Sequence, residues 1–151
     1  MTLRKINARD VTIQVALVDG TTWVEVGGLN SATPKLAENE ESVDTTTFSS
    51  QGNYEGEIMQ RGASLALEGF VLKDDITGAP NPGQDRCTQL ALLTGYASLG
   101  KIRFRAPVDT NWTVWNEATF SVGEQGGGNN DKISWKCDIM RSGPSVLVSV
   151  S

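Results

Sequence analysis

A two-residue alternation of apolar and polar side chains near the middle of the chain most constrains the fold. Apolar side chains occur at positions of one parity, Ala63, Leu65, Leu67 and Val71, and the polar Ser64 and Glu68 have the other parity. Side chains of a β-strand point alternately to opposite faces, so this pattern is typical of a strand that buries one face. We therefore expect a half-buried strand over residues 63–73.

A long polar segment, residues 30–60, precedes this strand. It is rich in Ser, Thr, Asn, Glu and Gly, and it carries five widely spaced apolar side chains, Leu36, Val43, Phe48, Tyr54 and Ile58. Structureless loops of this length are uncommon in compact domains and are usually functional or disordered. So few apolar groups do not offset the entropy of ordering the chain. We interpret the segment as a long loop that is disordered in the free protein.

The rest of the chain reads mainly as strands. An Asp19-Gly20 turn joins the alternating run 11–17 to a short strand at 22–26, which predicts a hairpin. Further strands are expected at 101–106, 112–122, 133–139 and 146–150. Cys87, Leu90 and Ala91 have helical spacing, so a helix should begin near Gly83 and end near Gly95. The sequence thus predicts a mostly β fold, an antiparallel sandwich or barrel with one packed α-helix.

The length of 151 residues is sufficient for one hydrophobic core, and we expect a single domain over residues 1–151. No apolar run follows the charges at the N-terminus, and no stretch approaches the roughly 18 apolar residues of a membrane span. We expect a soluble chain made in a cytoplasm. Cys87 and Cys137 occupy apolar-face positions and are expected to be buried free thiols.

The chain contains no histidine, which excludes Ser-His-Asp and Cys-His nucleophiles and histidine-based zinc sites. An enzyme would need carboxylate, Lys or Tyr chemistry. The pairs Glu55/Glu57 and Glu38/Glu41 would suit a glycoside hydrolase only on a rigid scaffold, and they lie in the polar segment. We therefore expect no catalytic residue.

No cofactor or metal site is expected either. Four oxygen-bearing side chains gather around the start of the helix, but they lack the spacing and closing Glu of a calcium loop: Asp74, Asp75, Asn81 and Asp85. The run Gly126-Gly127-Gly128 has no following Gly-Lys-Ser/Thr and leads into a strand, so it indicates a hairpin tip and no phosphate site.

The four tryptophans suggest an alternative function, a carbohydrate-binding β-sandwich. Trp112 and Trp135 share parity with apolar neighbours and are predicted to be core residues. Trp115 lies among Thr113, Glu117 and Thr119 and is expected to be exposed. With Trp23 from the short hairpin strand, it would form a platform for sugar rings. An exposed Trp115 would equally suit a protein interface.

The net charge of −5 and the pI of about 4.7 argue against adhesion to nucleic acid, which needs a clustered basic face. An acidic surface is nonetheless compatible with DNA sliding past it without binding.

The order of elements resembles the major tail tube protein of long-tailed, siphovirus-type bacteriophages. The resemblance covers most of the chain and rests on five segments: Val26-Gly-Gly-Leu29, Val43-Asp-Thr-Thr-Thr-Phe48, Gly62-Ala-Ser-Leu-Ala-Leu-Glu-Gly69, the helix before Arg103, and the closing hairpin with Asn130-Asp-Lys-Ile-Ser-Trp135 and Ser142-Gly-Pro144. It implies a structural virion protein, not an enzyme, that forms hexameric rings stacked into a hollow tube. Contractile-tail tubes, secretion tubes and tail terminator rings share the fold and remain alternatives.

The resemblance also implies partners: further copies of the chain, a tape-measure protein and other tail proteins, with DNA passing through the lumen and no membrane. The protein would be made in the host cytoplasm and reside in the virion tail. Residues 30–60 would then form an inter-subunit loop that buries its apolar side chains on a neighbour. Polar side chains that alternate with the core are candidates for the lumen face: Thr12, Gln14, Ser64, Glu68, Glu117 and Thr119. An acidic lumen wall would repel phosphates.

Overall fold

The structure, a computed structural model, describes residues 1–150. Its elements follow along the chain as η1 (Ala8–Asp10), β1 (Thr12–Ala16), β2 (Trp23–Glu25), β3 (Leu29–Asp44), η2 (Phe48–Ser50), β4 (Gly56–Phe70), α1 (Pro82–Ala91), η3 (Gly95–Ser98), β5 (Gly100–Arg105), β6 (Asn111–Val122), β7 (Ser134–Arg141) and β8 (Ser145–Ser149), where η marks a short 3₁₀ helix. All pairings between these strands are antiparallel. The expectation of a mostly β fold with one α-helix is confirmed.

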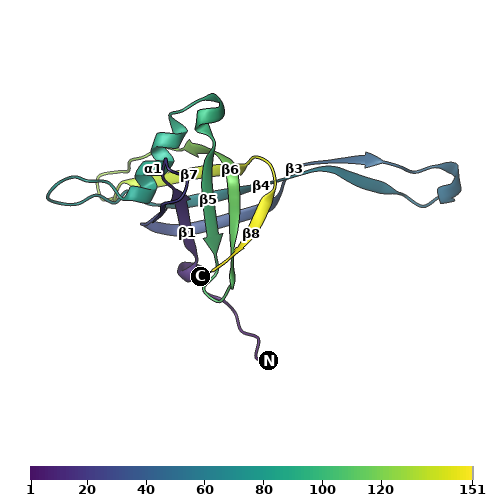
Figure 1. The fold of residues 1–151 in the computed structure, drawn as a ribbon, viewed down its shortest axis with the longest axis horizontal. Helices are drawn as coiled ribbons and strands as arrows, with labels where there is room; N and C mark the ends of the chain where they lie inside the picture. The colour runs from purple at the N-terminus through teal and green to yellow at the C-terminus, as the bar shows by residue number, and fades with distance from the viewer. Residues whose placement is uncertain (151) are drawn as a thin grey trace.

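The strands form one sheet in the order β2-β1-β5-β6-β7-β4-β3, and β8 also pairs with β6. The sheet bends at strand β6, which pairs with different strands along its two halves. Its residues 111–115 pair with β8, and its residues 118–122 pair with β7. In Figure 1, β1, β5, β6 and β8 cross in front of β3, β4 and β7. The sheet is thereby bent into two layers, which confirms the sandwich.

The core lies between the two layers. Alternate residues of β1, β4 and β7 are buried there, as the alternation predicted, and they meet β5 and β6: Ile13, Val15, Leu65, Leu67, Ile102, Trp115, Trp135 and Ile139. Helix α1 covers one end of this core with Cys87 and Leu90. Cys87 and Cys137 are buried free thiols, as expected. A hydrogen bond with the neighbouring Cys137 thiol, together with burial, raises the pKa of Cys87 well above its ordinary value, so it stays protonated.

Helix α1 begins where capping groups favour it. Asn81 accepts a hydrogen bond from the Gln84 backbone N–H at 3.1 Å, and Pro82 occupies the first turn. The Gln84 side chain is buried, and both its amide nitrogen and its amide oxygen form hydrogen bonds. Its Nε2 donates to the carbonyls of Gly27 and Phe70 at 2.9 and 2.8 Å, and its Oε1 accepts from Leu72 N–H at 3.1 Å. This amide ties the helix to the ends of β2 and β4.

The parity of β6 corrects the prediction for two tryptophans. Gly100 pairs with Ala118 and Ile102 with Trp115, so two residues of β5 span three of β6. Such a bulge reverses the side-chain alternation. Trp115 is consequently buried in the core, with its ring edge-on to Phe104 at 5.4 Å. Trp112 is buried as predicted, at 8% exposed, but it packs on the outer face against Arg103 and not with Trp135 in the core cluster.

Two strand boundaries also differ from the prediction. Strand β4 ends at Phe70 rather than residue 73, because Val71 bonds to Ile133 outside the regular ladder. Strand β7 begins at Ser134, and Ile133 is 56% exposed although the sequence places it with the core residues.

The interpretation of residues 30–60 as a long loop is wrong. Strands β3 and β4 pair from Leu29 to Asp44 in a long hairpin, with register shifts along its length. Beyond the body of the molecule the hairpin projects as a narrow ribbon (Figure 1). A ribbon that is exposed on both faces has no apolar alternation. The period-2 signal therefore appears only from Ala63, where β4 enters the core.

Candidate functional site

The projecting part of the hairpin is the most distinctive surface of the molecule. We call residues 36–62 the arm and residues 1–35 and 63–150 the body. The last pair that links β4 to β7 is Ser64 with Met140, so the arm strands pair only with each other. Within the arm, Ser50 alone is buried. A two-stranded hairpin is marginally stable by itself in water, so the arm is suited to packing against a partner.

The five apolar residues predicted for an inter-subunit contact all lie exposed on the arm: Leu36, Val43, Phe48, Tyr54 and Ile58. Leu36, Val43 and Ile58 lie on its strands, whereas Phe48 and Tyr54 lie at its tip. Met59 is also exposed there. The sequence analysis missed it because it directly follows Ile58, whereas the apolar residues that were singled out are widely separated. Exposed apolar side chains gathered on one projection are typical of an interaction surface.

The tip is closed by local hydrogen bonds. Thr46 Oγ1 accepts from Glu55 N–H at 2.9 Å, and Asp44 accepts from Thr46 N–H at 2.9 Å. Bonds from the Thr46 side chain and backbone lower the pKa of Asp44. The short helix η2 is held at its start by Thr47 and Ser50: Thr47 N–H donates to Ser50 Oγ, and Ser50 N–H donates to the Thr47 carbonyl, both at 3.0 Å. The tip therefore has a defined conformation.

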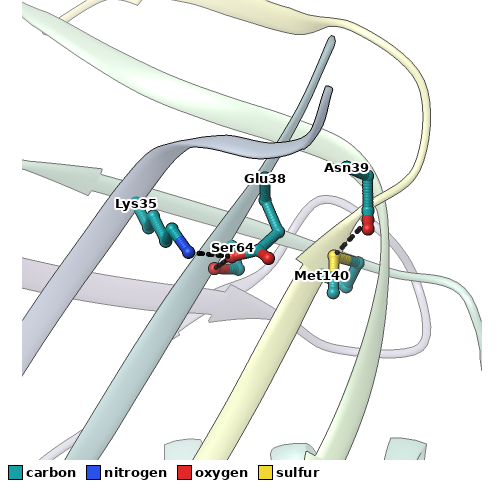
Figure 2. Close-up of polar contacts among 5 residues, drawn as sticks. All are labelled: Lys35, Glu38, Asn39, Ser64 and Met140. Carbon is teal, nitrogen blue, oxygen red and sulfur yellow. Dashed lines mark hydrogen bonds and ion pairs between the residues drawn. The ribbon is translucent and has the colours of Figure 1, made fainter. Parts of the chain in front are cut away.

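The base of the arm is fixed by polar contacts (Figure 2). Glu38 Oε2 accepts from Ser64 Oγ at 3.2 Å and lies 3.2 Å from Lys35 Nζ, while Asn39 Nδ2 donates to Met140 Sδ at 3.2 Å. Asn39 has φ of 54°, in the left-handed region, at a register shift of β3. These contacts and the bulge set the direction in which the arm leaves the body.

The arm carries all the net charge of the protein. Of the 18 acidic and 13 basic side chains, six acids and Arg61 lie in the arm, so the rest has 12 of each. Glu38 and Glu40 pair with Lys35 and Arg61. The arm thus combines negative charge with exposed apolar groups.

The candidate lumen residues are divided by the structure. Ser64 and Thr119 line a shallow depression on the outer face of β4, β7 and β6, and Glu68 lies nearby, 3.7 Å from Lys136 Nζ. Thr12 and Gln14 lie on β1, in the other layer, and Glu117 lies at the bulge of β6. Outer faces of two packed layers point away from each other, so Thr12 and Gln14 lie on the opposite side of the molecule from Ser64 and Thr119.

A stack of aromatic rings around a guanidinium occupies the outer face of β1, β2, β5 and β6. The Arg103 guanidinium carbon lies 4.3 Å from the Trp23 ring centroid and 4.2 Å from that of Trp112. Sequence reasoning missed this cluster, because the three residues come from separate strands and the parity of Trp112 was misread. Trp115 is buried, and Arg103 covers Trp23, so the proposed sugar platform of these two rings does not exist.

The residues considered as metal ligands or catalytic carboxylates have structural roles or do not lie close to one another. Asp74 accepts from the N–H groups of Ile76 and Thr77, which lowers its pKa, and Asn81 caps α1. Within residues 1–150, no three metal-ligating side chains come together. Glu55 and Glu57 stand on the exposed arm. No helix in the described part of the chain is long and apolar enough to cross a membrane.

The fold defines a class: a bent antiparallel sheet with one helix at its end and a projecting hairpin arm. The same fold occurs in a chain from the tail of an empty gene transfer agent (GTA) particle, a tail with C6 symmetry. The TM-score is 0.67 at 21% identity, over 96% of this chain and 98% of the other. For a chain in the virion of a native GTA particle, the TM-score is 0.66 at 22% identity, over 95% of this chain and 98% of the other. No protein-family model and no curated protein matches the sequence. The resemblance inferred from sequence is confirmed for the fold.

Proposed function

We propose that the protein is the structural subunit of a phage-like tail tube in the virion. In this proposal, copies form hexameric rings that stack into the conduit for genome delivery, and the chain has no enzymatic activity. The observation that carries the proposal is the shared fold over nearly the full length of chains from GTA particles, one of them in a tail with C6 symmetry. A tape-measure protein and other tail proteins would be further partners.

The arm supplies the physical reason for assembly. Its apolar side chains are exposed in the single chain, and its two strands have no other support. Packing against a neighbouring copy would bury them, at roughly 25 cal/mol per Å² of apolar surface. Contacts between different surfaces, repeated around an axis, close into a ring, and repeated along the axis they give a tube. The arm is therefore the proposed inter-subunit element.

The outer face of β4, β7 and β6 is the proposed lumen wall. Ser64, Glu68 and Thr119 lie there, whereas the opposite layer presents Arg103 beside Gln14. A cationic aromatic surface would hold phosphates and stacked bases, and a polar or acidic wall would release them. We therefore retain Ser64, Glu68 and Thr119 as lumen residues and assign Thr12, Gln14 and Glu117 to other surfaces.

Electron microscopy of the purified protein, concentrated alone or mixed with a tape-measure partner, tests the assembly. Hexameric rings or stacked tubes are the expected result, and rings that never stack would instead favour a terminator role. A protein that stays monomeric under all such conditions would refute the proposal.

The lumen assignment has its own test, with a matched control. Particles carrying Glu68→Lys should assemble but eject DNA more slowly, because an attractive wall retains phosphates. Glu117→Lys makes the same charge change outside the proposed lumen and should leave ejection normal. Equal ejection by both variants would contradict the placement of Glu68 in the channel.

A further inference from the structure

The outer face of β1, β2, β5 and β6 carries a cation without an acidic partner. Arg103 lies between the rings of Trp23 and Trp112, and the Arg105 guanidinium carbon lies 5.1 Å from the Trp112 centroid. Arg103 Nε and Nη2 both donate to the neutral Gln14 Oε1, at 2.8 and 2.6 Å. The ion pairs found among residues 1–150 join other side chains. We call Trp23, Arg103, Arg105 and Trp112 the Trp-Arg surface.

The surroundings of these arginines favour an anion. Burial lowers the pKa of Arg103, although an arginine remains charged at any physiological pH. Arg105 Nε is buried and has no hydrogen-bond partner within the described residues. A partly desolvated guanidinium gains most from a charge-assisted bond to a carboxylate or phosphate.

An apolar cleft adjoins the cations. It has a volume of about 210 Å³ and opens between the layers, where Arg105 lines it beside the apolar Phe104, Val11 and Pro34. Asp109 also lines it, and the Asp109 backbone carbonyl accepts a hydrogen bond from Arg105 Nη1 at 3.3 Å. A partner that fits this region would therefore present negative charge together with apolar side chains. Aromatic rings, arginine and a neighbouring apolar cleft are typical of the central part of protein interfaces.

The arm is a segment of this chain with that composition. It carries six carboxylates against one arginine, and its apolar side chains are exposed. Figure 1 shows that it points away from the body, so it does not cover its own Trp-Arg surface. Glu38 and Glu40 are paired at the base, and Asp44 is bonded within the tip. Glu55 and Glu57, next to Tyr54, are the carboxylates available near the tip.

We propose that the Trp-Arg surface of one copy binds the acidic arm of a second copy, with Glu55 and Glu57 facing Arg103 and Arg105 and Tyr54 near the tryptophan rings. This inference rests on the proposed tube function and specifies its interface. It also separates the two outer faces of the body: one lines the channel, and the other receives a neighbour.

Charge reversal on either side tests the contact. Arg103→Glu, and separately the arm double variant Glu55→Arg with Glu57→Arg, should raise the protein concentration needed for assembly about tenfold or more, because each places like charges together. Combining Arg103→Glu and Arg105→Glu with the arm double variant should restore assembly. Lys132→Glu is the matched control, since it makes the same charge change on an exposed loop, and it should assemble normally.

The outcomes separate the hypotheses. Light scattering and electron microscopy measure assembly, and thermal melting shows whether each variant folds. If Arg103→Glu does not fold, the arm variant decides, since it leaves the body unchanged. Wild-type rings together with unchanged assembly of the arm variant would overturn this inference alone, whereas no wild-type assembly would refute the proposed function. Binding of a short DNA duplex that Arg103→Glu abolishes, with assembly intact, would assign the surface to phosphate and also overturn it.

Discussion

The body and the arm are built from the same kind of antiparallel pairing but differ in what the strands bury. In the body, β4 places Ala63, Leu65 and Leu67 in the core, with other strands on its flank and across the sandwich. A few residues earlier the same strand is exposed on both faces and pairs with β3 alone. Backbone hydrogen bonds define the shape of both regions, and apolar burial makes only the body stable by itself. The following experiments test that contrast.

The largest effect is expected from truncating the core. Trp115→Ala removes a fully buried side chain and should lower the free energy of unfolding by about 3–5 kcal/mol. Urea denaturation, followed by circular dichroism, measures it. Near-wild-type stability would show that Trp115 is exposed, as the sequence alone indicated, and would reopen the question of a ligand platform.

A change at the base of the arm should be smaller and local. Asn39→Val places a β-branched residue at a φ of 54° and should lower the free energy of opening the arm hairpin by about 1–3 kcal/mol. Because the arm forms no part of the core, the loss should appear as faster hydrogen exchange of arm amides. Asn39→Gly is the control, since glycine adopts this conformation freely. Equal loss in both variants would mean that the Asn39 side chain, bonded to Met140, matters more than the backbone.

Truncating the tip should scarcely change the stability of a single subunit. Phe48→Ala and Tyr54→Ala remove exposed rings and should alter the free energy of unfolding by less than about 0.5 kcal/mol. If the arm is an inter-subunit element, the same variants should lose ring or tube formation. Analytical ultracentrifugation with parallel denaturation curves separates the two effects. A substantial loss of subunit stability would show that the tip supports the body.

The smallest expected effect is a loss of stability at low pH through the Asp19 carboxyl. Bonds from the Thr22 side chain and from the backbone of Thr22 and Thr21 lower the pKa of Asp19 from 3.8 to about 2. A depressed carboxyl pKa stabilises the fold fully above pH 3.8, and this contribution is lost as the pH falls through about 2. An NMR titration of the carboxyl measures the pKa directly. Asp19→Asn should remove this part of the acid dependence, whereas Asp44→Asn should loosen only the arm tip.

How much the sequence predicts depends on where a strand buries one face. The strands around Ile13, Leu65 and Cys137 and the helix at Cys87 were predicted because their apolar periods match their packing. The arm was missed since its strands bury neither face. Trp115 was wrongly predicted to be exposed, and Trp112 was assigned to the wrong face, because one extra residue at the β6 bulge reverses parity and nothing in the local sequence marks it. The Arg103 cluster is a tertiary contact of distant strands, beyond any local pattern.

The placement of charge also bears on colloidal behaviour. The body has as many basic as acidic groups, so its long-range field is weak, whereas the arm carries the whole imbalance. Repulsion between arms acts over a Debye length of roughly 8 Å at physiological salt and reaches farther in dilute buffer. The element that carries the repulsive charge thus also exposes apolar side chains. Added salt weakens this repulsion and should promote any association driven by the arm's apolar groups, while association driven by ion pairs should respond in the opposite sense.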